Sequence, residues 1–398
     1  MLGSAMPRMA TPAPFSLATN GRCQCHPDPG DTLFSRDFQG RVLYDTGMTA
    51  VALPVLDVTD PRHEDAQVIS GPRDISSVRT LRISVTDRCN FRCVYCMPED
   101  KLDWVARDNL LTFEEIVEVA RVALDLGIGG FKLTGGEPLV RHDLHRLVAM
   151  LKALPGEPEL SMTTNGALLD EHAGALFDAG LDRITVSMDS MRTDRFRAFT
   201  RGADLTQVWR GIHAAVAAGF KHPKINCVTM RGMNDDEFAD FAALTIETDC
   251  TVRFIEYMPL GRTALGGEYE LRFIPEEDIR RQIEQRHGPL IAAHRDSGHG
   301  PAVVWKIPGA KGRIGFISAM SKPFCATCNR LRLTAEGQLR SCLFDGGEVE
   351  LRPILRDRTA ANSAGPAGAV RRAFIDCIAF KPEVHSYFGN RQMSQIGG

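Results

Sequence analysis

The chain has 398 residues, and its 47 basic and 50 acidic side chains leave a formal net charge of −3, so no global basic field favours nucleic acid as a partner. Hydrophobic residues make up 43% of the chain and charged residues 24%, which is typical of a globular protein, and the length allows two or three domains. No apolar run approaches the roughly 20 residues of a membrane-spanning helix, and the first residues lack the apolar core of a signal peptide.

Residues 1–77 are rich in Pro, Gly, Asp and Thr and show little hydrophobic periodicity. We expect a leader that is mostly disordered or extended, in which the stretch FQGRVLY is the candidate for a short ordered piece. The first 20 residues carry Arg8, several Ser and Thr, and no acid. Two locations are therefore considered: the cytoplasm, or the mitochondrial matrix if the leader is an import signal.

From about residue 79, short β-rich runs alternate with amphipathic stretches. The stretches 113–127, 143–154 and 206–220 place apolar residues at the spacing of a helix face. This alternation predicts parallel β/α units. Six units are visible, not the eight of a closed barrel, so residues 78–270 are expected to form an incomplete (β/α)6 barrel of the α/β class. The expected strands are 80–86, 130–136, 159–166, 183–190, 224–230 and 251–258.

After about residue 270 the pattern changes, because Gly and Pro become more frequent. The stretches 302–308 and 312–318 are expected to form antiparallel strands, and a helix is expected around residues 367–378. We therefore predict a smaller C-terminal α+β domain over residues 271–398.

Eleven cysteines are many for a chain without a secretion signal, in which clustered cysteines more often bind metal or carry out redox chemistry than form disulfides. Six of them stand in two groups of three: Cys89, Cys93 and Cys96 in the stretch CNFRCVYCMP, and Cys325, Cys328 and Cys342. The others are expected to be small buried side chains or leader residues, namely Cys23, Cys25, Cys227, Cys250 and Cys377.

Reactive groups in α/β barrels gather at the carboxyl ends of the strands, and the unusual residues of this chain fall there. The first three-cysteine loop follows the first expected strand, GGEP (135–138) follows the second, and TTNG (163–166) ends the third. Ser187 and Asp189 end the fourth strand, and Met258 ends the sixth. We therefore predict that these motifs meet at one mouth of the barrel.

Three cysteines rather than four suggest a [4Fe–4S] cube, because three thiolates hold three irons and leave the fourth iron open to a ligand. A zinc ion with a distant fourth ligand is the alternative. The second group also lacks a fourth cysteine, and Arg330 and Arg332 follow Cys328 in alternation, so on a strand they would face one way. Guanidinium groups suit phosphates or purine edges, whereas an ordinary solvated strand face is the alternative.

The stretch CNFRCVYC, with an aromatic residue immediately before the third cysteine, resembles the signature of the radical S-adenosylmethionine (SAM) superfamily. GGEP resembles the loop of that superfamily for the SAM amino group, although a tight turn is the alternative for GGEP alone. From about residue 80 to residue 398 the chain resembles the GTP 3′,8-cyclase (molybdenum cofactor biosynthesis protein A) family. The matching motifs are LRISVTDRCNFRCVYCMP, LTGGEPLVR, MTTNG, VSMDS, KINCVTMRGMNDDE, RFIEYM, PFCATCNRLRLT and MSQIGG.

The resemblance implies two [4Fe–4S] clusters and SAM as cofactors, GTP as substrate, and a role for each matching position. The implied ligands of the SAM-cleaving cluster are Cys89, Cys93 and Cys96. The implied ligands of the second cluster, whose open iron binds guanine, are Cys325, Cys328 and Cys342. The implied SAM contacts are Tyr95, Gly136, Ser187 and Met258. The implied GTP contacts are Arg82, Lys132, Thr163, Lys224, Arg330, Leu331 and Arg332.

In the implied reaction, a 5′-deoxyadenosyl radical from SAM removes the hydrogen at the ribose 3′ carbon of GTP. The ribose radical adds to guanine carbon 8, and an electron and a proton then give 3′,8-cyclo-7,8-dihydro-GTP, a precursor of the molybdenum cofactor. The resemblance further implies an electron donor and the downstream cyclic pyranopterin monophosphate synthase as functional partners. A homodimer is a candidate assembly, and no nucleic-acid or membrane partner is expected.

The terminal pair Gly397 and Gly398 allows several interpretations. It can be a disordered terminus, and it is also similar to the tails of ubiquitin-like proteins. In the cyclase family such a tail reaches into the active site, and only Gly is slim enough for a narrow channel; Arg391 would assist there. Two other functions stay open for the whole chain: a radical SAM maturase that modifies peptides, and a zinc-stabilised binding module without enzymatic activity.

Overall fold

The computed structural model describes residues 34–36, 42–44, 73–100, 102–294, 300–346, 349–356 and 365–397. The chain divides after Gln67 into two units. In the first unit, strands β1 (Phe34–Arg36) and β2 (Val42–Tyr44) pair antiparallel. Strand β2 lies in the stretch FQGRVLY. Apart from β1 and β2, the leader residues up to 72 lie outside the described ones. The predicted limits of the leader and of the two domains therefore remain predictions.

The second unit is built on a curved sheet whose centre consists of parallel strands in chain order, from β3 to β8. Each begins at the first residue of a stretch in which a strand is expected, which confirms the predicted (β/α)6 arrangement. These strands are β3 (Thr80–Ser84), β4 (Gly130–Thr134), β5 (Glu159–Thr164), β6 (Arg183–Ser187), β7 (Lys224–Thr229) and β8 (Thr251–Glu256).

Strands from the C-terminal part of the chain extend this sheet at both edges. Strand β11 (Arg313–Ile317) pairs parallel with β8, and β12 (Arg330–Leu333) pairs parallel with β3. Because an open barrel leaves unpaired N–H and C=O groups along both edge strands, these pairings satisfy groups that would otherwise be exposed. Antiparallel strands continue the sheet on either side, namely β9 (Ile291–Ala292), β10 (Val303–Lys306), β13 (Gln338–Arg340) and β14 (Val349–Glu350).

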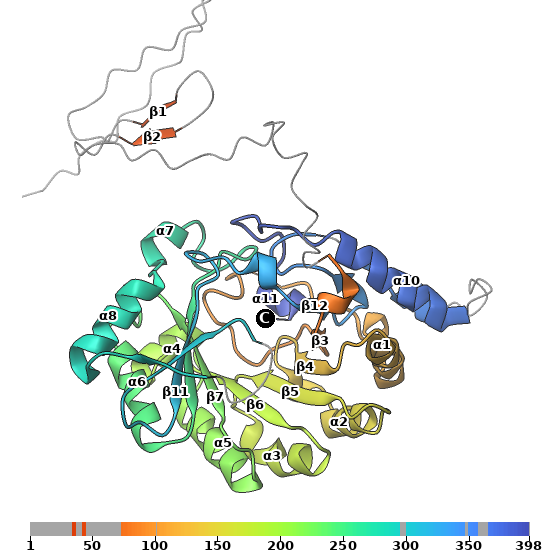
Figure 1. Cartoon of the computed structure of the whole chain (residues 1–398), viewed down its shortest axis with the longest axis horizontal. Coiled ribbons are helices and arrows are strands. Elements are labelled where there is room, and N and C mark those ends of the chain that lie inside the picture. The colour runs from red at the N-terminus through yellow and green to blue at the C-terminus, as the bar shows by residue number, and fades with distance from the viewer. Residues whose placement is uncertain are drawn as a thin grey trace, which may run out of the picture. The chain divides into compact units, whose positions relative to one another are not determined.

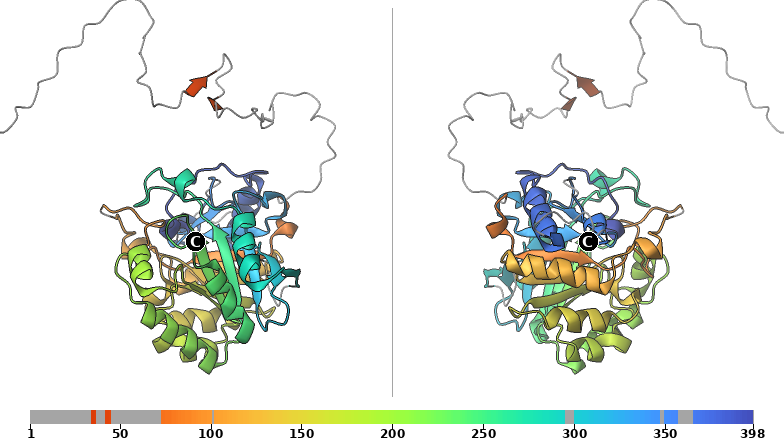
Figure 2. Two further views of the ribbon diagram at one scale, coloured as in Figure 1. Left: turned by 90° about the vertical axis from the view of Figure 1, so that its left-hand side faces the viewer. Right: turned by 90° about the vertical axis from the view of Figure 1, so that its right-hand side faces the viewer.

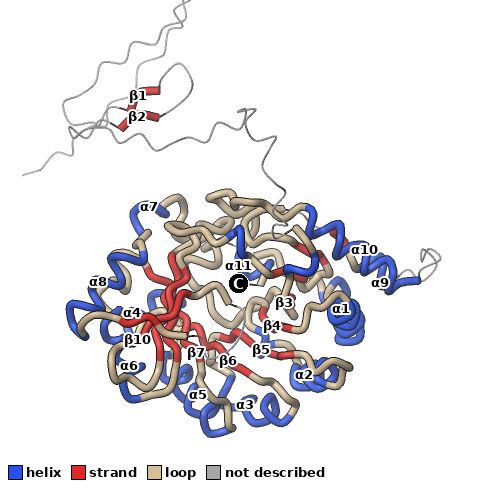
Figure 3. The backbone as a smooth tube through the Cα atoms, in the orientation of Figure 1, coloured by secondary structure: helices blue, strands red, loops and turns tan. Residues whose placement is uncertain are grey.

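Helices follow the parallel strands and lie on the outer side of the arc, whereas the C-terminus lies inside it (Figures 1 and 3). Figure 2 shows the same outer layer of helices from two sides. No helix in the described ranges has both the length and the apolar character that crossing a membrane requires. The helices are α1 (Phe113–Asp125), α2 (Leu144–Lys152), α3 (Leu169–Asp178), α4 (Thr193–Thr200), α5 (Leu205–Ala218), α6 (Phe238–Glu247), α7 (Tyr269–Arg272), α8 (Glu276–His287), α9 (Arg352–Arg356), α10 (Gly365–Ala379) and α11 (Met393–Ile396).

Local sequence explains where these helices begin and end. At the start of α1, the Thr112 hydroxyl accepts a hydrogen bond from the main-chain N–H of Glu115, and the Glu115 carboxylate accepts one from the N–H of Thr112. This capping box satisfies two N–H groups that the helix itself leaves unpaired. Helix α5 ends at Ala218, and Gly219 follows with φ 111°, a left-handed conformation that glycine adopts without strain.

The parallel strands have one apolar face and one polar face, because successive side chains in a strand point to opposite sides. In β3, Leu81 and Ile83 are fully buried in the core, whereas Arg82 faces the inside of the arc. In β4, Phe131 is likewise buried in the core and Lys132 faces inward. The helices therefore cover the apolar face, and the polar face surrounds the interior.

Candidate active site

A cavity of about 340 Å³ lies inside the arc, and the polar faces of the strands line it. All six cysteines of the two groups line this one cavity, although more than 200 residues separate the groups in the chain. The first group lies in the loop after β3, and the second lies around β12 and β13. The two groups therefore face a common space, as the resemblance leads us to expect.

The first cysteine group lies in a tightly hydrogen-bonded loop. The main-chain N–H of Cys96 donates to the Cys93 carbonyl oxygen at 3.0 Å, which forms a turn between them. The cysteines are free of disulfides, and burial raises the pKa of Cys89 to about 11 and that of Cys96 to about 12. Because burial makes these thiols costly to ionise on their own, they are suited to bind a metal cluster, whose positive charge offsets that of the thiolates.

A neighbouring segment clamps this loop from the junction of α4 and α5. The Arg201 guanidinium donates to the carbonyl oxygens of Arg92, Met97 and Pro98, the last at 2.9 Å. The main-chain N–H of Val94 also donates to the Phe199 carbonyl oxygen at 2.9 Å. The loop therefore has its conformation fixed by partners more than a hundred residues later in the chain.

The GGEP loop packs directly against the main chain that leads into the cysteine loop. A Cβ atom on Gly136 would lie 2.3 Å from the carbonyl oxygen of Arg88, so the close approach requires glycine there. The main-chain N–H of Gly136 donates to the Thr86 carbonyl oxygen at 2.7 Å. The glycine is thus needed for packing as well as for any ligand contact.

Glu137 of the same loop joins it to the end of β5. Its carboxylate accepts hydrogen bonds from the Thr164 hydroxyl and from the main-chain N–H of Asn165, both at 2.7 Å. The amide Nδ2 of Asn165 lies 3.8 Å from the Cys89 sulfur. Burial raises the pKa of Glu137 to about 7. The motifs after three different strands are therefore joined by direct contacts.

The predicted SAM contacts Tyr95, Gly136, Ser187 and Met258 all line the cavity. The Tyr95 hydroxyl donates to the Asp189 carboxylate at 2.8 Å, and the other carboxylate oxygen accepts the main-chain N–H of Val228 at 2.9 Å. Burial raises the pKa of Asp189 to about 6. Nothing contradicts the SAM roles of these residues, which remain a prediction.

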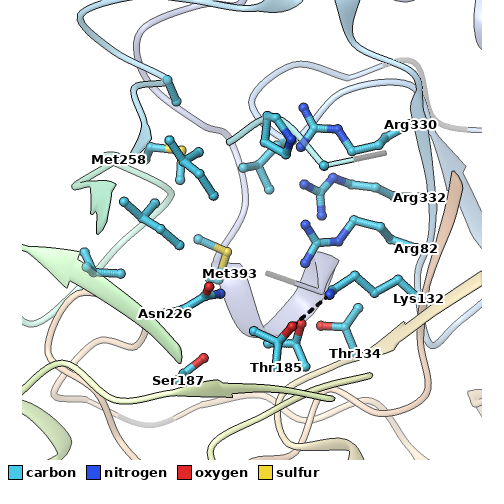
Figure 4. A pocket seen from close by; sticks show the side chains of 18 of the residues that line it. Arg82, Lys132, Thr134, Thr185, Ser187, Asn226, Met258, Arg330, Arg332 and Met393 are labelled. Carbon is cyan, nitrogen blue, oxygen red and sulfur yellow. Dashed lines mark hydrogen bonds between the residues drawn. The ribbon is translucent and has the colours of Figure 1, made fainter. Parts of the chain in front are cut away.

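A row of cationic side chains forms another wall of the cavity. In the parallel register Arg332 of β12 lies opposite Arg82 of β3, which lies opposite Lys132 of β4, so all three point to the same side. Figure 4 shows them one above another below Arg330, with Met258 and Asn226 across the cavity. Burial and the neighbouring guanidinium groups lower the pKa of Arg82, and burial lowers that of Arg332 to about 10.

The second cysteine group begins in the turn Cys325–Thr327. The Arg330 guanidinium approaches the Cys328 sulfur, with Nη2 to Sγ at 3.5 Å. Although burial raises the pKa of Cys328, the charges of Arg330 and Lys381 lower it to about 7. Among the described residues, no group of three or more Cys, His, Asp or Glu side chains lies close enough together to hold a single metal ion.

Several buried polar atoms on the cavity wall have no hydrogen-bond partner in the protein. They are Oγ1 of Thr163, Oδ1 of Asn226 and Nε of Arg253, and all three residues line the cavity. Buried polar atoms without a partner are destabilising, so their presence on one wall indicates a polar ligand that completes them.

Comparison with known proteins gives two family matches. The Radical SAM superfamily model matches residues 83–245, and the Molybdenum Cofactor Synthesis C model matches residues 250–387. GTP 3′,8-cyclases of Pelotomaculum thermopropionicum and Moorella thermoacetica are 43% and 44% identical to the chain over 325 residues, which are 81% of this chain and 98% of each relative. That of Pseudomonas syringae is 46% identical over 308 residues, 77% of this chain and 90% of the relative.

The chain belongs to the GTP 3′,8-cyclase family. The predicted family and its fold, a radical SAM α/β barrel followed by a C-terminal part, are thereby confirmed. Radical SAM membership implies an iron–sulfur cluster and SAM. The first cysteine group fits such a cluster, because it offers three free thiols on the wall of a cavity.

Three described residues of the predicted cyclase site do not line the cavity, namely Leu331, Arg391 and Gly397. The Leu331 side chain is fully buried in the core, because it alternates with Arg330 and Arg332 on β12. Arg391 forms an ion pair with Glu336, Nη1 to Oε1 at 3.1 Å. Gly397 lies next to the cavity, where its carbonyl oxygen accepts a hydrogen bond from Arg332 at 2.5 Å, and Gly398 is outside the described residues.

Sequence reasoning missed other polar residues on the cavity wall of this cyclase family member. The missed residues are Arg183, Thr185, Asn226, Arg253, Lys381 and His385. Alternation would have found those on strands, because Asn226 and Arg253 each stand between buried apolar neighbours. No local pattern marks Lys381 and His385, because the loop after α10 has no periodicity.

Proposed function

We infer that this protein catalyses the radical SAM cyclisation of GTP to 3′,8-cyclo-7,8-dihydro-GTP, an early step in molybdenum cofactor biosynthesis. The observation that carries this inference is that one cavity is lined by both cysteine groups and by the row Arg332, Arg82 and Lys132. When bound, an iron–sulfur cluster and SAM supply the 5′-deoxyadenosyl radical. The protein supplies position, charge and exclusion of water.

The cationic row fits the triphosphate of GTP. Three positive side chains on neighbouring strands offset a highly charged anion locally, although the whole chain is slightly acidic. Lys224, on β7, lines the same cavity. The hydroxyl of Thr163 has no partner within the protein, which supports its predicted contact with GTP.

The opposite end of the cavity suits SAM. Glu137 and Asp189 are the carboxylates among the lining residues, and both lie beside the first cysteine group, where a sulfonium and an ammonium would need negative charge. Separate anionic and cationic ends orient the two ligands relative to each other. A hydrogen transfer requires such orientation, since the reacting atoms must approach to about 3–3.5 Å.

We propose that Cys325, Cys328 and Cys342 hold a second [4Fe–4S] cluster whose open iron binds guanine. Three cysteines at the cavity wall leave one iron free, as in the first group. The hydrogen bond from Arg332 to Gly397 supports the predicted role of the tail, since it joins the C-terminus to the cationic row. The proposed role of the tail in the active site includes Gly398 and Arg391.

The reaction also needs an external electron donor, and its product requires a downstream enzyme, the predicted cyclic pyranopterin monophosphate synthase. We also propose that the protein forms a homodimer and that it is located in the cytoplasm. Oxygen-sensitive clusters make a reducing compartment necessary.

Anaerobic incubation with SAM, GTP and dithionite tests the proposed function. The expected result is 5′-deoxyadenosine that appears with GTP and not without it, together with about eight irons per chain. Formation of 5′-deoxyadenosine independent of GTP would favour the peptide-modifying alternative. Zinc in place of iron would favour the binding module.

A further inference from the structure

A short segment of the chain lies beside the second cysteine group and has no role in the proposed function. Residues 381–385, with the sequence KPEVH, follow α10 and turn two side chains inward. Lys381 is 2% exposed and His385 is 6% exposed, and both line the cavity. The neighbouring Glu383 and Val384 are exposed, Val384 by 61%, so Lys381 and His385 are the fully buried positions of the segment.

Lys381 lies beside Cys328. Its ammonium donates to the carbonyl oxygen of Arg330 at 2.7 Å, and its positive charge, like that of Arg330, acts to lower the pKa of Cys328. The carbonyl oxygen of Lys381 in turn accepts a hydrogen bond from Arg73 at 3.0 Å. The lysine is therefore held at both its main chain and its side chain.

His385 contacts the surroundings of the other two cysteines. Its side chain lines the cavity together with Cys325 and Cys342. Its ring stacks on Phe344, two residues after Cys342, with centroids 4.1 Å apart and planes inclined by 8°. The ring nitrogens lie 2.9 Å from the Ala319 carbonyl oxygen and 2.7 Å from that of Ser386, which fixes the ring. The segment thus adds a lysine and a histidine to the cavity wall that carries the second cysteine group.

The burial of Lys381 needs a reason. Removing an ammonium group from water costs hydration free energy, and this cost remains unless an anionic partner offsets it. Its ammonium donates to a neutral carbonyl oxygen, and the Arg330 guanidinium, whose Nη2 lies 3.5 Å from the Cys328 sulfur, is a further cation nearby. An anionic thiolate ligand with cluster sulfides behind it is the partner that would compensate two such cations.

We propose that the segment 381–385 is the outer shell of the second cluster, in which Lys381 places a buried positive charge beside Cys328 and so raises the reduction potential of that cluster. The inference rests on the proposed second cluster. Hydrogen bonds and charge near the sulfurs set the potential, because added positive charge favours the reduced, more negative state.

The test uses the full chain with Cys89, Cys93 and Cys96 all changed to Ala, so that only the second group can hold a cluster. Iron, sulfide and the midpoint potential are measured anaerobically in this parent. They are then measured in the same background with Lys381→Gln, Lys381→Arg or Arg372→Gln. Arg372 is exposed on α10, so its change removes one unit of positive charge that water already screens.

We expect about four irons in all four proteins. The midpoint potential should become more negative in Lys381→Gln, shift less in Lys381→Arg, and stay unchanged in Arg372→Gln. Loss of iron from Lys381→Gln alone would also support the proposal, because it would show that the charge is needed to hold the cluster.

An unchanged potential in Lys381→Gln with four irons retained would overturn this proposal and leave the proposed function intact. Equal shifts in Lys381→Gln and Lys381→Arg, or equal iron loss in Lys381→Gln and Arg372→Gln, would also overturn it, because neither depends on the charge at this position. A parent that binds no iron would instead refute the second cluster itself.

Discussion

The carboxylate of Glu137 is 1% exposed and accepts hydrogen bonds from N–H and O–H groups that carry no charge. Neutral donors only partly replace the water that an ionised carboxylate loses, so burial raises its pKa to about 7 from an ordinary 4.5. The group therefore binds its proton more tightly in the folded protein than in the unfolded chain. Stability must depend on pH in the range between the two pKa values.

We predict that Glu137 makes the metal-free protein less stable as pH rises from about 4.5 to about 7. Below that range both states are protonated, and above it the folded state carries the full cost of a buried charge, about 3 kcal/mol by the size of the shift. The measurement is the free energy of unfolding in urea at pH 5 and pH 8, for the wild type and for Glu137→Gln. The wild type should lose stability relative to the variant at pH 8. A difference that is the same at both pH values would contradict the prediction.

At the scale of elements, the loop that carries the first cysteine group depends on a clamp from the junction of α4 and α5. Arg201 occupies a left-handed conformation, φ 56°, and from there its guanidinium reaches three carbonyl oxygens of the loop. Hydrogen bonds from a charged donor contribute about 1.5–3 kcal/mol each where the geometry is good. Arg201 should therefore contribute more to the free energy of unfolding than an exposed arginine does.

We predict that Arg201→Gln lowers the free energy of unfolding of the metal-free protein by about 3 kcal/mol and reduces the iron that the first cysteine group retains. Arg197→Gln, an exposed position on α4, is the matched control and should change stability by less than about 0.5 kcal/mol. Urea denaturation under reducing conditions measures the first effect, and iron analysis after anaerobic reconstitution measures the second. If both variants behave alike, the clamp has no special role.

The same elements show what sequence could and could not predict. The parallel strands β3 to β8 were predictable because each is a short β-rich run and a helical stretch follows it. The pairing of β12 with β3 was not, because the register between Arg332 and Arg82 joins residues 250 positions apart, and no local pattern contains it. The cysteines were predictable from their spacing. Arg201 and Lys381 were not, because each is defined by a contact that only the fold creates.

Across the whole molecule, the barrel concentrates positive charge in its interior although the chain has a net charge of −3. Burial, followed by the charges of Arg253, Arg82, Lys224 and Arg183, lowers the pKa of Lys132 well below its ordinary value. Groups so arranged repel one another until an anion enters. The cavity is therefore organised for its ligand at some cost in stability, which is common in binding sites.

We predict that Lys132→Met raises the melting temperature of the ligand-free protein and reduces the further rise that GTP produces. Each kcal/mol of repulsion removed should raise the melting temperature by about 1–2 °C in a protein of this size, and the lost phosphate contact should weaken GTP binding. Guanosine, which lacks phosphates, should stabilise wild type and variant equally. Lys221→Met, at an exposed position, controls for the loss of charge and should leave both quantities unchanged. A variant that is destabilised without ligand, or that keeps the full response to GTP, would show that Lys132 supports the fold rather than the anion.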